Sequence, residues 1–83
     1  MAFCTYILRS ASTDRFYVGH AEDLARRVGE HNSNRVDATK HRGPWEVAYT
    51  EEFATRAEAG RRERYIKSQK SRKWIEQLVR ASR

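Results

Sequence analysis

The sequence predicts one small α/β (α+β) domain with three strands and three helices in the order ββαβαα. Two observations carry this prediction: apolar residues alternate with polar ones in the strand segments, and they recur at helical spacing elsewhere. A chain of 83 residues can fold as a single domain with a modest core, so we expect one domain over residues 1–83. The chain starts with Met1 and is expected to be complete.

Residues 3–19 are predicted to form a β-hairpin, because the runs CTYILR and RFYVG flank the polar turn SASTD. A register that sets Arg9 against Asp14 makes an opposite-charge pair, whereas a shift by one residue opposes two arginines. The favoured register sets Tyr6 directly opposite Tyr17 on one face of the sheet. Such a pair is either an ordinary packed aromatic contact or part of a functional site, and the pair alone does not decide.

The later elements follow from local signals. We expect a helix over 22–31 with acidic residues in its first turn, where the helix dipole favours them, and a polar loop over 32–44. A half-buried strand is expected over 45–53, in which Trp45, Val47 and Tyr49 share one face. Two helices complete the chain, one over 56–69 capped by Thr55 and one after Ser71 with an apolar stripe of Trp74, Ile75, Leu78 and Val79.

The net charge of +6, from 17 Lys+Arg against 11 Asp+Glu, favours a polyanionic partner such as nucleic acid, although a solvated basic surface would give the same balance. No segment has the length and hydrophobicity of a membrane helix or of a signal peptide. The single cysteine, Cys4, excludes an internal disulfide and fits a reducing, cytoplasmic compartment. It also argues against a structural zinc site of the usual Cys/His kind.

Two predicted helices place polar side chains on their apolar faces. Leu24, Arg27, Val28 and His31 lie at i, i+3, i+4 and i+7 of the first helix. Arg27 and His31 either reach out from the margin of this stripe or face a cleft in which a phosphate neutralises Arg27. On the second helix, Glu63 shares a face with apolar residues. It is either a member of a Glu–Arg surface pair or a carboxylate held for a hard divalent cation.

The order and spacing of several motifs resemble the GIY-YIG nuclease family. The matching features are Tyr6, the run Tyr17-Val18-Gly19, Arg27 and His31 in DLARRVGEHN, and Glu63 in RRERYIK. The resemblance covers about residues 3–80 and is greatest to the small single-domain bacterial branch, similar to the N-terminal nuclease domain of a bacterial excinuclease. One departure is that the first motif keeps only its tyrosine, since it reads Cys4-Thr5-Tyr6.

This resemblance implies a three-stranded antiparallel sheet flanked by helices and metal-dependent phosphodiester hydrolysis. Tyr6 would accept the proton of the attacking water, and Tyr17 would orient that water or bind the phosphate. Arg27 would clamp the non-bridging oxygens, and His31 would assist proton transfer or bind phosphate. Glu63 would hold one Mg²⁺ or Mn²⁺ ion, and Gly19 would let the backbone approach the site closely.

Basic residues outside the predicted catalytic set are candidates for contacts with the phosphate backbone. For those within residues 32–44, the alternative is that the segment is an ordinary mobile loop. The candidates are Arg35, Lys40, His41, Arg42, Lys67, Lys70 and Lys73. The expected substrate is DNA rather than RNA, selected by its structure in repair or recombination. The chain is expected to be a monomer or weak homodimer, with a protein partner as a source of specificity. The alternatives are a catalytically silent nucleic-acid-binding domain of the same fold and a small protein that binds an acidic partner.

Overall fold

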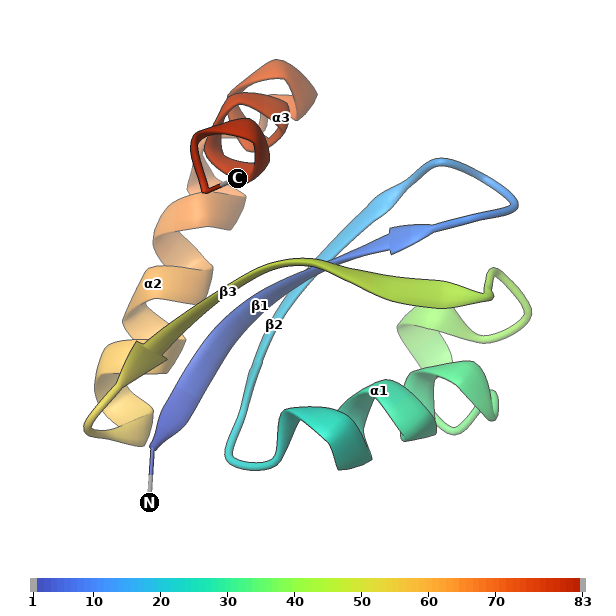
Figure 1. Ribbon diagram of the computed structural model, residues 1–83, viewed down its shortest axis with the longest axis horizontal. Coiled ribbons are helices and arrows are strands. Elements are labelled where there is room, and N and C mark those ends of the chain that lie inside the picture. Colours follow the sequence, from blue (N-terminus) through green and yellow to red (C-terminus); the bar gives the residue numbers. More distant parts are fainter. Residues whose placement is uncertain (1, 83) are drawn as a thin grey trace.

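The strands and helices form in the predicted order, and the computed structural model describes residues 2–82 (Figure 1). Met1 and Arg83, the two ends of the predicted domain, lie outside the described residues. The elements are β1 (Phe3–Ser10), β2 (Phe16–Ala21), α1 (Leu24–Asn32), a single 3-10 turn at Asp37–Thr39, β3 (Trp45–Phe53), α2 (Arg56–Ser68) and α3 (Arg72–Ala81). Within residues 2–82, no helix combines the length and the hydrophobicity needed to cross a membrane.

The three strands form an antiparallel sheet in the order β2-β1-β3, as the resemblance implied. Helix α1 covers one face, and α2 with α3 covers the other (Figure 1). Successive side chains of β1 point to opposite faces, so Tyr6 and Leu8 pack towards α1 while Ile7 packs towards α2 and α3. Strand β2 is left at an edge of the sheet, where groups from both faces can meet around it.

The hairpin register differs by two residues from the predicted one. Tyr6 pairs with Gly19, and Tyr17 pairs with Leu8, so the two tyrosines are diagonal rather than directly opposite neighbours. A shift of two residues keeps both rings on the same face, and their centroids lie 6.5 Å apart. The predicted Arg9–Asp14 contact does form, at 2.6 Å between Nε and Oδ1, but it forms through the side chains alone. Asp14 adopts a φ of 61° in the turn and does not join the ladder.

A β-bulge breaks the predicted alternation of β3. Ile7 pairs with Tyr49 and Leu8 pairs with Val47, so one residue of β3 has no partner on β1. As a result Trp45 packs towards α1, whereas Tyr49 packs towards α2 and α3. Val47 is left 44% exposed. The expectation that Trp45, Val47 and Tyr49 share one face was therefore wrong.

The helix caps agree with the sequence except at the start of α1. Thr55 accepts a hydrogen bond from the Glu58 backbone N–H, and Ser71 caps α3 in the same way. Helix α1 begins two residues later than predicted, because the Asp23 side chain caps it by accepting from the Arg26 backbone N–H. Glu22 thus lies outside the helix.

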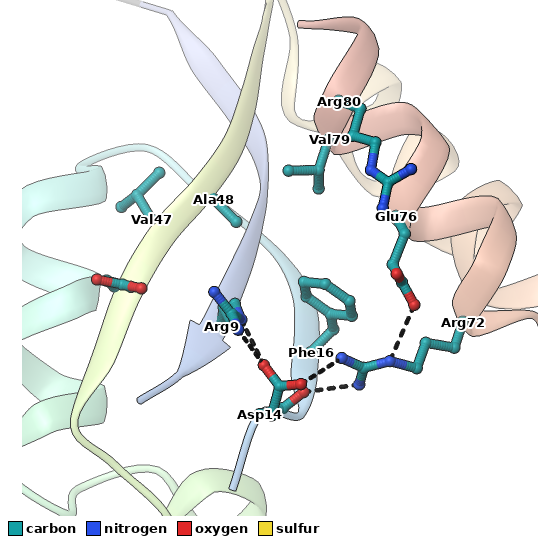
Figure 2. Close-up of a pocket in the computed structure, with 10 residues that line it drawn as sticks. Arg9, Asp14, Phe16, Val47, Ala48, Arg72, Glu76, Val79 and Arg80 are labelled. Atoms are coloured by element: carbon teal, nitrogen blue, oxygen red, sulfur yellow. Dashed lines mark hydrogen bonds and ion pairs between the residues drawn. The ribbon is translucent and has the colours of Figure 1, made fainter. Parts of the chain in front are cut away.

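The hairpin turn is fastened to α3 by a chain of ion pairs at the end of the sheet away from the N-terminus (Figure 2). Asp14 accepts from Arg9 and from Arg72, and Arg72 also contacts Glu76 at 3.1 Å. The hydrogen bond from Arg9 makes the largest contribution to a lowered pKa of Asp14, and Arg72 contributes less. A cavity of about 360 Å³ lies beside this network, and the residues that line it include none of the predicted catalytic residues. We regard the network as structural.

Candidate active site

The end of the Tyr6 side chain lies close to the backbone of Gly19 on the neighbouring strand, where no side chain is in its way. A Cβ atom added to Gly19 would lie 2.6 Å from the Tyr6 hydroxyl oxygen, closer than any side chain could tolerate. Gly19 is therefore required for the tyrosine to reach over β2, which agrees with the close approach expected of this position. Tyr6 is only 1% exposed, so its hydroxyl is covered in this structure.

His31 lies beneath the two tyrosines and fixes the Tyr6 hydroxyl. Its Nε2 is 2.9 Å from the Tyr6 oxygen, and its Nδ1 is 2.7 Å from the hydroxyl oxygen of Thr39. Thr39 comes from the 3-10 turn within the predicted loop, and both His31 and Thr39 are 1% exposed. His31 therefore does not reach out to solvent from the margin of its helix, and its buried ring is not open to a phosphate. Contact with Tyr6 remains its available role.

Burial and the neighbouring charges set the proton affinities of Tyr6 and His31. Burial raises the pKa of Tyr6 to about 12, although the Arg27 guanidinium beside it opposes this effect. Burial, together with the charge of Arg27, lowers the pKa of His31, so the imidazole is neutral at pH 7. A neutral imidazole can accept the Tyr6 proton at Nε2 while it donates from Nδ1 to Thr39.

The buried, neutral state of His31 predicts how stability depends on pH. The folded-state pKa lies below the ordinary value of about 6.5, so the unfolded chain binds the proton more readily. This contribution to stability is fully present above about pH 6.5 and is lost as the pH falls from there towards the folded-state pKa. We expect the thermal unfolding midpoint to fall over that window. An NMR titration of the His31 ring checks the cause, and a ring that titrates at its ordinary pKa would contradict it.

Arg27 is the exposed member of the group. Its side chain is 38% exposed, and its only ion pair among the described residues is with Glu30, at 3.2 Å. The guanidinium is therefore open to solvent, and it can exchange the Glu30 carboxylate for a phosphate. Its effect on the Tyr6 pKa is consistent with a position close to that hydroxyl.

Glu63 reaches the site from the opposite face of the sheet. Its Oε1 lies 2.6 Å from His20 Nδ1, and its Oε2 lies 2.6 Å from Lys67 Nζ. Burial would raise the pKa of Glu63, but the hydrogen bonds from Lys67 and His20 outweigh it and keep the pKa below its ordinary value. A Glu–Arg surface pair, one of the two interpretations of Glu63, does not form within residues 2–82. The partners of Glu63 among the described residues are His20 and Lys67.

Strand β2 lies between two groups of site residues, with the tyrosines and His31 on the α1 side and His20 with Glu63 on the α2 side. The negative charge of Glu63 contributes, as the smallest of several causes, to the raised pKa of Tyr6. The Lys67 ammonium lies 5.8 Å from the centroid of the Tyr17 ring. A cavity of about 830 Å³ adjoins the site, and both His20 and Arg27 line it. Arg56, at the start of α2, also lines this cavity and pairs loosely with Glu22 at 3.7 Å.

His20 is the functional candidate that the sequence reasoning missed. It directly follows the Tyr17-Val18-Gly19 run, and the alternation of strand side chains points it away from Tyr17, towards α2. The sequence gives an indirect signal for His20. Helical spacing places Glu63 on the inner face of α2, and His20 is the strand residue that this carboxylate contacts. What the sequence could not provide was the packing of α2 against β2 rather than against β3.

The seven predicted phosphate-binding residues fall into two exposed groups. Arg35, Lys40, His41 and Arg42 lie between α1 and β3, and Lys67, Lys70 and Lys73 lie at the junction of α2 and α3. The segment after α1 is anchored, because the Ser10 hydroxyl donates to the Arg42 carbonyl at 2.6 Å. Of the seven, Lys67 is the one that contacts a predicted catalytic residue within the described chain.

Glu63 is the carboxylate that the site offers to the expected divalent cation. Within residues 2–82, no group of three or more His, Cys, Asp or Glu side chains could enclose a metal. Glu63 is nevertheless ionised, 17% exposed and already carries a cation, the Lys67 ammonium, on one oxygen. A single carboxylate of this kind fits a hard cation that retains most of its water ligands, as Mg²⁺ does.

Comparisons with known proteins show which chains this one is similar to. The model of the GIY-YIG catalytic domain family matches residues 2–76. A UPF0213 protein of Listeria monocytogenes is 41% identical over 63 residues, which cover 75% of this chain and 70% of that protein. The solution NMR structure of the UPF0213 protein BH0048 from Bacillus halodurans is also similar. It has 34% identity and a TM-score of 0.61, and the match covers 98% of this chain and 85% of that one.

A longer relative carries a functional name. The structure-specific endonuclease subunit slx1 of Pyrenophora tritici-repentis is 36% identical over 50 residues, which are 54% of this chain but only 14% of that protein. The match to the family model covers most of the chain, from residue 2 to residue 76. The chain therefore belongs to the GIY-YIG family of nuclease catalytic domains.

Proposed function

We propose that this protein is a divalent-metal-dependent endonuclease that hydrolyses phosphodiester bonds of nucleic acid. The observation that carries the proposal is the cluster of Tyr6, Tyr17, His31 and Arg27 over Gly19, with a neutral imidazole 2.9 Å from the Tyr6 hydroxyl. Phosphodiester hydrolysis needs an activated water, a stabiliser for the transition-state charge and help for the leaving oxygen. The cluster and Glu63 offer one group for each need.

Tyr6 and His31 would act together on the attacking water. A phenol with a pKa of about 12 is a poor base alone. His31 removes this difficulty, because Tyr6 can take a proton from water while it passes its own proton to His31 Nε2. The water becomes the nucleophile, the imidazole becomes imidazolium, and no free phenolate forms. Since Tyr6 is 1% exposed, the site must open before water can reach its hydroxyl, and we propose that a movement of Arg27 opens it.

Arg27 would make that movement when a phosphate arrives. Its exposed pair with Glu30 contributes little to stability, so exchange for a phosphate oxygen costs little. The planar guanidinium can bind two non-bridging oxygens at once and stabilise the transition state. Tyr17 is half-buried beside Tyr6 and would orient the water or hold the phosphate through its hydroxyl.

Glu63 would hold one Mg²⁺ or Mn²⁺ ion, which supplies charge neutralisation at the leaving oxygen when bound. The carboxylate is suited to this role because it is ionised and reaches solvent. His20 holds its other oxygen.

The physiological substrate is proposed to be branched or otherwise structured DNA, with a role in repair or recombination. The support comes from the name of the fungal relative, a subunit of a structure-specific endonuclease. A subunit has a partner by definition, and we propose that a protein partner supplies part of the specificity here as well. Cytoplasmic location remains a proposal that rests on the single free cysteine, Cys4.

The burial of Tyr6 favours one alternative, a catalytically silent nucleic-acid-binding domain. The two functions are separated by incubating labelled branched, nicked, duplex and single-stranded DNA and RNA with the protein and Mg²⁺ or Mn²⁺. The proposal predicts metal-dependent cleavage of at least one substrate, with structured DNA preferred. Binding to these substrates without cleavage of any of them would support the silent domain instead.

Nucleic-acid binding is expected to weaken steeply with salt. The logarithm of the binding constant should fall linearly with the logarithm of the salt concentration, by about 0.9 per phosphate contact on duplex DNA. If Arg35, Lys40, Arg42, Lys70 and Lys73 make such contacts, the slope amounts to several units, and Lys40→Ala should reduce it by about 1. Fluorescence anisotropy at several salt concentrations measures the slope. A slope near zero would point to a protein as the main partner.

A further inference from the structure

The two oxygens of Glu63 are held by donors of different kinds. His20 comes from strand β2, and its imidazole is 30% exposed, whereas Lys67 comes from the next turn of α2 and is 50% exposed. Both contacts are 2.6 Å long. Nothing about sequence spacing requires His20 to be there, since it lies 43 residues from Glu63.

We propose that His20 is a positioning residue that fixes the Glu63 carboxylate for a divalent cation, and that Lys67 is the cation which the metal displaces. This inference rests on the proposed metal role of Glu63. It assigns a purpose to His20 that neither the sequence motifs nor the family match supplies.

His20 has the rigidity that a positioning residue needs. Its backbone pairs with Thr5 on the central strand β1, so the sheet fixes its Cα position. Its ring lies against α2, where a Cβ atom added to Gly60 would be in ordinary contact with Cε1 at 3.6 Å. A short side chain held between a strand and a helix keeps Glu63 Oε1 in one place, as residues behind metal ligands commonly do.

Lys67, in contrast to His20, is not held rigidly. Its contact with Glu63 is a pair four residues apart on one helix, and half of its side chain is exposed. Such exposed pairs contribute little to stability, and the long lysine side chain can adopt other rotamers. Its ammonium lies 5.8 Å from the Tyr17 ring centroid, so a lysine released from Glu63 stays beside the place proposed for the phosphate. A cation at Glu63 Oε2 would repel the ammonium and favour this exchange.

Manganese binding tests the inference without relying on activity. Calorimetric titration of the full chain with Mn²⁺ would compare the wild type with Lys67→Met, His20→Ala and His20→Asn. Asparagine is included because its amide N–H can replace the Nδ1–H of histidine. Arg61→Met is the matched control, because it also removes one exposed positive charge from α2 but forms no ion pair within residues 2–82.

We expect Lys67→Met to bind Mn²⁺ about threefold to tenfold more tightly than the wild type, because the competing charge is gone. His20→Ala should bind about tenfold more weakly, and His20→Asn should recover most of that loss. Arg61→Met should stay within about twofold of the wild type. Circular dichroism of each variant establishes that it is folded, and the Lys67 comparison tests the exchange even if His20→Ala does not fold.

Equal Mn²⁺ affinity in the wild type, Lys67→Met and His20→Ala would overturn the inference, as would the absence of Mn²⁺ binding to every variant. A gain in Arg61→Met as large as that in Lys67→Met would also overturn it, since net charge alone would then explain the effect. The proposed function fails in a different way, by the absence of cleavage of any nucleic acid. The predicted order of Mn²⁺ affinities without cleavage would support the inference and reject the nuclease activity.

Discussion

Replacing Arg27 with alanine is expected to reduce the rate of phosphodiester cleavage by a factor on the order of 10²–10³. The guanidinium is the exposed cation beside the Tyr6 hydroxyl, and the proposed mechanism requires it to bind the phosphate. Stability should change little, by less than about 1 kcal/mol, because the pair with Glu30 is exposed to solvent. Single-turnover cleavage and thermal unfolding of the same preparation measure the two effects.

Arg61→Ala provides the control for Arg27→Ala. It removes an equal charge from an exposed position on α2 that forms no ion pair within residues 2–82. We expect near wild-type cleavage from this variant. If both variants lose cleavage to the same extent, the loss reflects the net charge of the protein rather than a contact in the site. If Arg27→Ala cleaves normally, Arg27 is a surface residue without a catalytic role.

Glu63→Gln is expected to abolish detectable cleavage at ordinary Mg²⁺ concentrations, a loss of roughly 10³-fold or more if the metal supplies several kcal/mol. Glutamine keeps the size of the side chain and an oxygen that can accept from His20, but it removes the charge that the cation needs. Nucleic-acid binding should be unchanged or tighter, because a negative charge close to the phosphates is gone.

Affinity, cleavage and folding must be measured on the same sample of Glu63→Gln. Intact binding with lost cleavage supports the metal role. Loss of folding would instead make Glu63 a structural partner of His20 and Lys67, and full activity would remove the proposed mechanism. Because Lys67 loses its anionic partner in this variant, Lys67→Met serves as the companion that breaks the same pair while leaving the carboxylate.

The fold could be predicted from the sequence because its signals are local. Thr55 and Ser71 are side-chain caps, and the helices after them begin where the caps indicate. The predicted hairpin register was wrong because the register depends on the backbone conformation of the turn. Asp14 adopts a positive φ and leaves the ladder while still pairing with Arg9 through its side chain. The bulge opposite Ile7 likewise has no counterpart in the alternation of β3.

The site was predictable only in part, for a similar reason. Tyr6 and Tyr17 share a face in any register of the same parity, and the helical spacing of Arg27 and His31 directs them to the sheet. The burial of His31 depends on Thr39, which comes from a segment with no apolar periodicity. The contact of Glu63 with His20 depends on how α2 crosses the edge of the sheet, and no pattern within one element encodes that.

The proposed mechanism requires that the chain cleave nucleic acid through its own residues around the edge of β2. The decisive experiment is single-turnover cleavage of the preferred labelled substrate by wild type, Arg27→Ala and Glu63→Gln, purified identically and assayed with Mg²⁺ and with a chelator. We predict cleavage by the wild type with Mg²⁺ but not with the chelator, cleavage slower by a factor on the order of 10²–10³ by Arg27→Ala, and no detectable cleavage by Glu63→Gln. Equal cleavage by all three preparations would contradict the mechanism, as would a wild type that binds the substrates and cleaves none of them.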